Sequence, residues 1–227
     1  MLSVITSVYN SEEFLPAFLS AVNNQLLPSF EILFYDANST DKSLEIIKNF
    51  KFREGIQYRI IEGSERIPLY NAWNIMIKEA KGNYIVNWNT DDLIYPSGLL
   101  MYEFYTRKIP DVDLFYGGHL HIKASSYYDV TNVRIWPEPD LKILKQICIC
   151  GPFPCVKKES LINVGLFDES LKYSSDYDMW LKLMFNGKKF ERIPEFIGCF
   201  FDRPESISIA NIEQAQKEDR AIHERYK

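Results

Sequence analysis

The first half of the chain is a series of apolar runs of two kinds. Runs rich in Val, Ile, Phe and Tyr alternate with segments in which apolar residues recur every three or four positions. The first kind is typical of buried strands and the second of amphipathic helices. The pattern predicts strands and helices in alternation, with strands at residues 3–8, 30–35, 57–61 and 84–88 and helices at residues 14–22, 41–50, 70–80 and 97–108.

This alternation is typical of a parallel sheet with crossover helices. We therefore expect an α/β fold with a Rossmann-like, mostly parallel central sheet flanked by helices. Ligands of such sheets bind beyond the carboxyl ends of the strands, where Ser7, Asp36 and Asp91 fall. Pro16 conflicts with the first predicted helix, because proline lacks the N–H that a helix interior uses.

The second half has a weaker pattern. We expect Gly117 and Gly118 to end a short strand, and residues 123–139, which are irregular and aromatic, to form a variable substrate loop. The charged tail at 211–227 is prone to form a helix, either solvated or bound to a partner. The remaining predicted elements are a strand at 113–116, a helix at 176–185 and a strand at 195–201.

Length and charge narrow the classes of protein. A chain of 227 residues fits one large α/β domain, and a net charge of −5 with scattered basic residues does not suggest a nucleic-acid partner. The N-terminus reads as a strand and not as a signal peptide, and no apolar window approaches the roughly 20 residues of a membrane helix. We expect a cytoplasmic protein without a transmembrane segment and leave peripheral attachment to the inner face of the membrane open.

The cysteines and histidines do not form a recognisable metal motif. Three of the four cysteines lie in CICGPFPC, whose spacing is not that of paired C-x-x-C ligands, and we expect them to be small buried apolar residues. His119 and His121 alternate as on a strand, and we interpret them as surface histidines or as histidines with hydrogen-bond partners.

Two adjacent carboxylates, Asp91 and Asp92, follow the apolar run at 84–88 in NWNTDDLIYP. Neighbouring carboxylates repel each other and resist burial, so their position suggests a cation. The alternative is that the pair only caps the following helix.

Several stretches, taken together in order and spacing, resemble the family 2 glycosyltransferases, which are inverting enzymes with the nucleotide-binding GT-A fold. They are SVITSVYNSEEFL, FEILFYDANSTDKS, LYNAWNIMIKEAKGNYIVNWNTDD and VGLFDESLKYSSDYDMWLKL. The resemblance covers roughly residues 1–205. It implies a single GT-A domain over 1–227, with a nucleotide-sugar-binding half at 1–110, an acceptor and catalytic-base half at 111–205 and a helical tail at 206–227.

The resemblance implies that Ser7, Tyr9 and Asp36 hold the nucleoside. An aromatic face can stack a base, and a carboxylate can accept a hydrogen bond from a base or ribose. The alternative is that Tyr9 belongs to the core and that Asp36 forms a turn. Ala37 stands where many members carry a second acidic residue, which makes the identity of the base less secure.

Asp91 and Asp92 match the family's DxD-type motif, which binds a divalent cation, Mn²⁺ or Mg²⁺, that clamps the donor's diphosphate. Such cations prefer oxygen ligands and use few protein carboxylates. Asn89 occupies the first position of the motif, so the sequence does not decide which aspartate contacts the metal.

Asp176 matches the family's general base, which removes the proton of the acceptor hydroxyl. Trp180 lies four residues later, on the same face of the predicted helix, and could wall the acceptor site. The alternative for Asp176 is a helix N-terminal charge favoured by the helix dipole. Three further residues align near the diphosphate and donor sugar, namely Glu65, Asn71 and Asn74. Arg203 could pair with a phosphate or form a surface salt bridge.

The expected function is transfer of a sugar from a nucleotide-sugar donor, with a UDP-sugar favoured, to a hydroxyl of a glycan or lipid-linked acceptor in cell-surface polysaccharide or glycan biosynthesis. A sugar-phosphate nucleotidyltransferase is disfavoured, because SVITSVYNSEE lacks a glycine-rich phosphate loop. A non-catalytic nucleotide-sugar-binding domain is the other alternative, and retention of Asp91, Asp92 and Asp176 argues against it.

Overall fold

Four parallel strands form the first half of the sheet in the computed structural model, which describes residues 1–123, 129–203 and 211–227. β1 pairs in parallel with both β2 and β4, and β2 pairs in parallel with β3. The strands are β1 (Leu2–Val8), β2 (Phe30–Asp36), β3 (Ile56–Glu62) and β4 (Tyr84–Asn87), and the helices of this half are α1 (Leu15–Asn23), α2 (Ser43–Asn49), α3 (Leu69–Glu79) and α4 (Gly98–Lys108).

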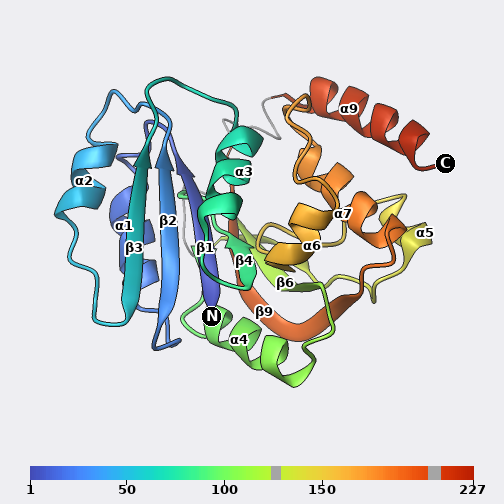
Figure 1. The fold of residues 1–227 in the computed structure, drawn as a ribbon, viewed down its shortest axis with the longest axis horizontal. Helices are drawn as coiled ribbons and strands as arrows, with labels where there is room; N and C mark the ends of the chain where they lie inside the picture. Colours follow the sequence, from blue (N-terminus) through green and yellow to red (C-terminus); the bar gives the residue numbers. More distant parts are fainter. Residues whose placement is uncertain (124–128, 204–210) are drawn as a thin grey trace.

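The second half extends the same sheet with mixed pairing (Figure 1). Its strands are β5 (Leu93–Ile94), β6 (Leu114–Lys123), β7 (Val130–Arg134), β8 (Cys155–Lys157) and β9 (Phe190–Asp202). Its helices are α5 (Leu141–Leu144), α6 (Lys158–Asn163), α7 (Ser175–Phe185) and α9 (Ile212–Arg225). The strand order is β3-β2-β1-β4-β8-β6-β9-β5, with β7 beside β6.

Alternate side chains of the strands enter two apolar cores, one on each face of the sheet. Ile5 of β1 packs in the core that contains Trp73 of α3 and Leu181 of α7. Val4 of the same strand packs in the other core, with Phe18 of α1 and residues of α2 and α4. The helices therefore cover both faces of the sheet, as the strand and helix pattern predicts.

A proline within α1 and two glycines within β6 occur where regular structure is not expected from the sequence. Pro16 lies in the first turn of α1, where the missing N–H has no partner in any helix, so it fits the helix. Gly117 and Gly118 do not end a strand, and that prediction was wrong. β6 continues through both glycines and pairs with β9. Glycine is required at position 117 because β9 passes so close that a Cβ there would lie 2.6 Å from the Glu195 carbonyl oxygen.

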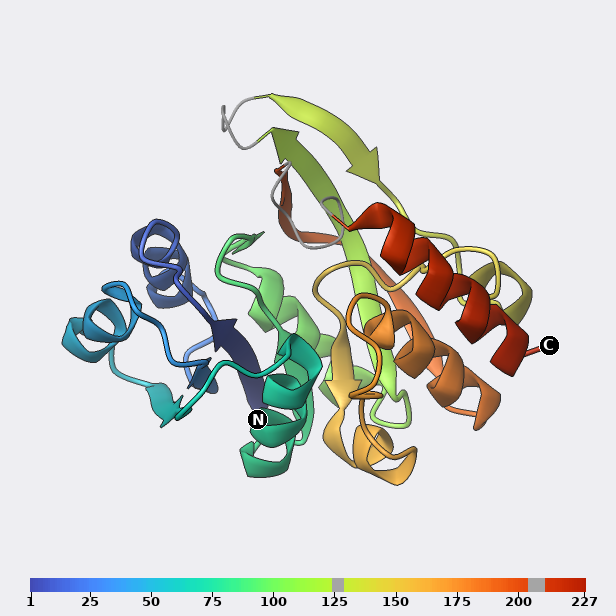
Figure 2. The same cartoon turned by 90° about the horizontal axis from the view of Figure 1, so that it is seen from above.

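The segment predicted to be irregular, 123–139, contains β7, which pairs in antiparallel fashion with β6. Residues 124–128 of that segment and residues 204–210 lie outside the described part of the chain. The predicted tail helix is α9, which lies beside α7 (Figure 2). Over the residues that the structure describes, no helix is both long and apolar enough to cross a membrane.

Candidate functional site

The carboxyl ends of β1 and β2 bring Ser7 and Asp36 together, because the parallel register places Ser7 opposite Tyr35 and Val8 opposite Asp36. Asp36 is only 2% exposed, and its Oδ2 accepts the Ser39 N–H at 3.1 Å. Its Oδ1 is buried and has no hydrogen-bond partner among the described residues. A buried acceptor of this kind is rare in folded proteins, so it marks a position where a ligand N–H or O–H can bind.

Tyr9 follows β1, and its side chain is exposed. The Arg66 guanidinium lies 4.2 Å from the ring centroid, a cation–π distance. Sequence reasoning missed Arg66, although its neighbour Glu65 was predicted to lie near the donor. Glu65 is exposed, and its charge contributes, after burial, to the raised pKa of Tyr35. The stack shows that a flat group can occupy the face of Tyr9.

Asp91 and Asp92 have different surroundings. Asp92 is 4% exposed and accepts the backbone N–H of Phe201 on β9 at 3.2 Å. Burial, and secondly the charge of Asp91, raise the pKa of Asp92 well above its usual range. Asp91 is partly exposed. The geometry therefore leaves Asp91 as the carboxylate that a ligand can reach, while Asp92 links this segment to β9.

Arg203 lies against the same segment. Its Nη2 donates to the Asp91 carbonyl oxygen at 3.3 Å, and its guanidinium lies 3.9 Å from the centroid of the Phe14 ring. Its Nε and Nη1 are buried without a partner in the described part of the chain. A guanidinium with unused donors beside a carboxylate pair can bind an anionic group.

Asp176 lies in the first turn of α7 and is partly exposed. Its Oδ1 accepts the Tyr177 N–H at 2.8 Å and lies 3.2 Å from the Tyr70 hydroxyl, which also donates to the Tyr173 carbonyl oxygen at 3.0 Å. Burial raises the pKa of Asp176, and the Asp219 carboxylate adds to that increase. A higher pKa makes the carboxylate a stronger base. Sequence reasoning missed Tyr70, because only the fold brings it to Asp176.

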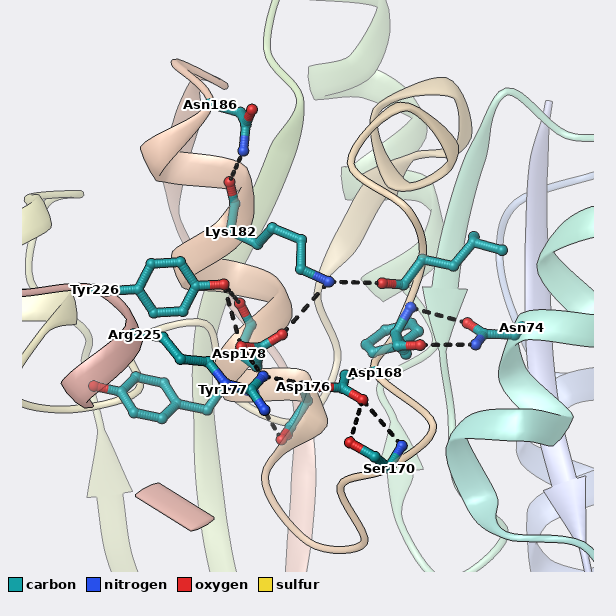
Figure 3. Close-up of polar contacts among 12 residues, drawn as sticks. Asn74, Asp168, Ser170, Asp176, Tyr177, Asp178, Lys182, Asn186, Arg225 and Tyr226 are labelled. Carbon is teal, nitrogen blue, oxygen red and sulfur yellow. Dashed lines mark hydrogen bonds and ion pairs between the residues drawn. The ribbon is translucent and has the colours of Figure 1, made fainter. Parts of the chain in front are cut away.

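Asn74 and Asn71 link α3 to the segment before α7. The Asn74 side chain makes two hydrogen bonds with the Phe167 backbone (Figure 3). Its Nδ2 donates to the Phe167 carbonyl oxygen at 2.9 Å, and its Oδ1 accepts the Phe167 N–H at 3.0 Å. Glu169 accepts from the side chains of both Asn74 and Asn71, at 2.9 and 2.8 Å. These contacts hold the two halves together, and a donor contact of either asparagine stays a prediction.

Trp180 is 2% exposed, and its ring packs edge-to-face on Phe167 with centroids 6.0 Å apart. Its side chain therefore lies on the face of α7 that packs in the core. The prediction that it walls an acceptor site stays a prediction.

The described cysteines are free thiols, three of them buried and Cys148 partly buried, in agreement with a packing role. His119 is buried, and its Nε2 lies 3.2 Å from Nε2 of His121, whose Nδ1 lies 2.9 Å from Asp202 Oδ1. Burial lowers the pKa of His119 to about 4. Each histidine therefore has a polar contact, but Nδ1 of His119 is buried without a hydrogen-bond partner in the described part of the chain, so the second interpretation holds only in part.

Carboxylates are the groups in the site that could hold a metal ion. Across residues 1–123, 129–203 and 211–227, His, Cys, Asp and Glu side chains do not form a group of three or more that could hold an ion by themselves. Asp91 fits a hard cation that is bound through one protein carboxylate and completed by ligand oxygens and water.

Comparisons with known proteins agree on one family. The family model for glycosyl transferase family 2 matches residues 3–156. A poly(ribitol-phosphate) beta-glucosyltransferase of Bacillus spizizenii is 28% identical over 95% of this chain and 38% of its own length. An uncharacterized glycosyltransferase of Rickettsia typhi is 28% identical over 81% of this chain and 58% of its own length. This chain thus spans less than two thirds of these relatives.

Solved structures share the fold. S. aureus TarS 1–349 in complex with UDP-GlcNAc superposes with a TM-score of 0.78 at 20% identity, covering 97% of this chain and 65% of that one. The mannosyltransferase PcManGT of Pyrobaculum calidifontis, in complex with GDP-Man and Mn²⁺, gives a TM-score of 0.74 at 17% identity, covering 98% and 62%. The chain, with its GT-A fold, therefore belongs to glycosyl transferase family 2.

Proposed function

We propose that the chain transfers a sugar from a nucleotide-sugar donor, with a UDP-sugar favoured, to an acceptor hydroxyl with inversion at the anomeric carbon. The contact between Tyr70 and Asp176 carries the proposal. Tyr70 lies at the start of α3, four residues after Arg66, which covers Tyr9 at the carboxyl end of β1. A carboxylate of raised pKa from the second half thus contacts a side chain of the first half, which supports a site shared by the two halves.

The first half, residues 1–110, supplies the donor site in this proposal. Asp36 Oδ1 accepts a hydrogen bond from the base, and the face of Tyr9, which Arg66 covers in this structure, stacks the base. Ser7 lies beside Asp36, within reach of the nucleoside. Arg203 turns its unused N–H donors to the diphosphate. Neighbours of the same fold carry UDP-GlcNAc and GDP-Man, which supports a nucleotide-sugar donor.

Asp91 would hold the divalent cation, Mn²⁺ or Mg²⁺, since an oxygen ligand of this kind suits a hard cation. The metal supplies positive charge against the charge that develops on the leaving diphosphate. PcManGT contains Mn²⁺, which supports the assignment. Asp92 fixes the segment through the Phe201 N–H.

The second half, residues 111–205, supplies the base. Asp176 takes the proton of the acceptor hydroxyl as the oxygen attacks the anomeric carbon from the side opposite the diphosphate. The new carbon–oxygen bond forms as the bond to the diphosphate breaks. One displacement inverts the anomeric configuration. The Tyr70 hydroxyl orients the carboxylate and stabilises its charged form.

We infer that the acceptor is a hydroxyl of a cell-surface polysaccharide or a related glycan. Two relatives support this inference, the poly(ribitol-phosphate) beta-glucosyltransferase and a chondroitin synthase of Escherichia coli. The second is 24% identical over 81% of this chain and 26% of its own length.

A thermal-shift panel of nucleoside diphosphates with and without Mn²⁺ tests the donor site. A ligand at 100 times its Kd should stabilise the fold by about 2.7 kcal/mol. We expect a Mn²⁺-dependent shift that is larger with UDP than with GDP or ADP, followed by transfer from a UDP-sugar to a polyol or glycan acceptor. A melt that no diphosphate shifts would contradict the proposal and favour a chain without a donor site.

A further inference from the structure

The C-terminal helix α9 binds the segment that precedes the proposed base. Glu218 Oε1 accepts the backbone N–H of Lys172 at 2.9 Å, and its Oε2 accepts those of Tyr173 at 2.8 Å and Ser174 at 3.0 Å. One carboxylate thus accepts three consecutive backbone N–H groups. Bonds of this kind to an ionised acceptor are short and strong, and together they fix the backbone of all three residues.

The same segment is linked to Asp176 through the Tyr70 hydroxyl. The Tyr173 carbonyl oxygen accepts the Tyr70 hydroxyl, which also lies 3.2 Å from Asp176 Oδ1. Ser174 is the N-cap of α7 but makes no capping bond through its side chain. Glu218 and Tyr70 therefore both hold the backbone at the start of α7.

A second set of contacts joins α9 to α7 just after Asp176 (Figure 3). Asp178 is 1% exposed, and its Oδ1 accepts Arg225 Nη1 at 3.2 Å and the Tyr226 hydroxyl at 3.1 Å. His223 Nε2 lies 2.9 Å from the Tyr177 hydroxyl. The end of α9 thus holds the residues that follow the base, and Glu218 holds those that precede it.

Apolar packing at the end of α9 adds to these contacts, since the ring centroids of Tyr226 and Phe185 lie 5.0 Å apart. Ile222 is the buried residue of α9. A cavity of about 350 Å³ remains between the helix and the segment before α7, lined by Leu171, Lys172, Tyr173, Gln214, Lys217, Glu218 and Ala221. Beside the bonds of Glu218, the Tyr173 hydroxyl donates to Asn211 Oδ1 at 3.3 Å and the Ser174 hydroxyl donates to the Ala215 carbonyl oxygen at 3.4 Å, so several hydrogen bonds join this segment to α9.

We propose that α9 is a positioning element of the catalytic site, in which Glu218 fixes residues 172–174 and thereby places the Asp176 carboxylate against the acceptor hydroxyl. Glu218 is a positioning residue, since it acts through the backbone of this segment. The proposal rests on the proposed function, in which Asp176 is the base.

The variant Glu218→Gln tests the proposal, because one acceptor oxygen becomes an NH₂ group that faces a backbone N–H. Glu213→Gln is the matched control, as Glu213 is exposed in the first turn of the same helix and loses the same charge. In Glu218→Gln we expect faster hydrogen exchange of the amides of residues 172–174. We expect kcat to fall about 10- to 100-fold, because a small misplacement of a reacting group is costly, with KM for the donor unchanged. Glu213→Gln should behave as wild type in both measurements.

The two measurements separate the ways in which the proposal can fail. Unchanged exchange in Glu218→Gln shows that Glu218 does not fix the segment. If exchange is faster in Glu218→Gln but its kcat, normalised to the concentration of UDP-binding sites, equals that of Glu213→Gln, the role of Glu218 is structural only. Either result overturns the proposal. If the wild-type chain transfers no sugar, the proposed function itself fails. If the wild-type chain transfers sugar and exchange is unchanged in Glu218→Gln, only the positioning role of α9 is refuted.

Discussion

The Tyr70 hydroxyl is the group through which the structure makes its most specific prediction about catalysis. Tyr70 is 3% exposed, and its ring stacks on Phe167 with centroids 5.7 Å apart. Tyr70→Phe keeps this packing and removes only the oxygen that lies 3.2 Å from Asp176 Oδ1. The hydroxyl stabilises the charged carboxylate, so its loss raises the pKa of Asp176 further above its usual range.

The size of the effect follows from the hydrogen bond. A bond to a charged group contributes about 1.5 to 3 kcal/mol, and the hydroxyl has one proton to share between Asp176 and the Tyr173 carbonyl oxygen. The low end therefore applies, about 1.5 kcal/mol, which equals about one pKa unit. A general base acts in its deprotonated form, so the acidic limb of the kcat profile should move to higher pH by about one unit. On that limb the rate should fall about tenfold, and above both pKa values it should recover.

The assay is kcat against pH at saturating donor, for wild type, Tyr70→Phe and a control. Tyr102→Phe is the control, because Tyr102 is equally buried and its hydroxyl donates to the Phe153 carbonyl oxygen at 2.6 Å. It should lose stability without moving the limb. A Tyr70→Phe limb that coincides with wild type, or a Tyr102→Phe limb that shifts as far, would refute the link between the hydroxyl and the base.

Three further predictions test other parts of the site. Asp176→Asn should abolish transfer while UDP binding, measured by calorimetry, stays nearly unchanged; an active variant would move the base elsewhere. The double variant Asp91→Ala, Asp92→Ala should remove the Mn²⁺ dependence of UDP binding. Asp91→Ala alone should do the same, because Asp92 accepts the Phe201 N–H. Mn²⁺-dependent affinity equal to that of the wild type would exclude this metal site. Asn74→Ala removes three hydrogen bonds and leaves backbone groups of the neighbouring segment unpaired, so urea unfolding should show a loss of about 2 to 4 kcal/mol; a loss near zero would show that water replaces the amide.

Local pattern predicts the first half of the fold well, because each element there contains its own signal. The strand at 30–35 differs from β2 by one residue at its C-terminal end, and the helix at 70–80 differs from α3 by one residue at each end. β8 has three residues, Cys155–Lys157, and is a strand because β4 and β6 flank it, so its signal lies outside its own sequence. Gly117 was misjudged for a related reason, since the backbone that excludes a side chain there belongs to β9.

The site shows the same division. Residues at strand ends, such as Asp36, are found from sequence because strand ends are local features and the parallel register follows from them. Tyr70, Arg66 and Glu218 are not found, because each matters through a partner that is distant in sequence. A charged tail such as α9 resembles a solvated helix until the backbone groups that its carboxylate binds are known.

The two adjacent aspartates at the end of β4 are compatible because they do not share an environment. Asp92 turns inward to the Phe201 N–H, and burial raises its pKa, which reduces the repulsion that two full charges would exert. The Arg203 guanidinium binds the carbonyl oxygen of Asp91 and leaves its carboxylate uncovered. One carboxylate thus anchors the segment to β9, and the other is left for the cation in the proposed function.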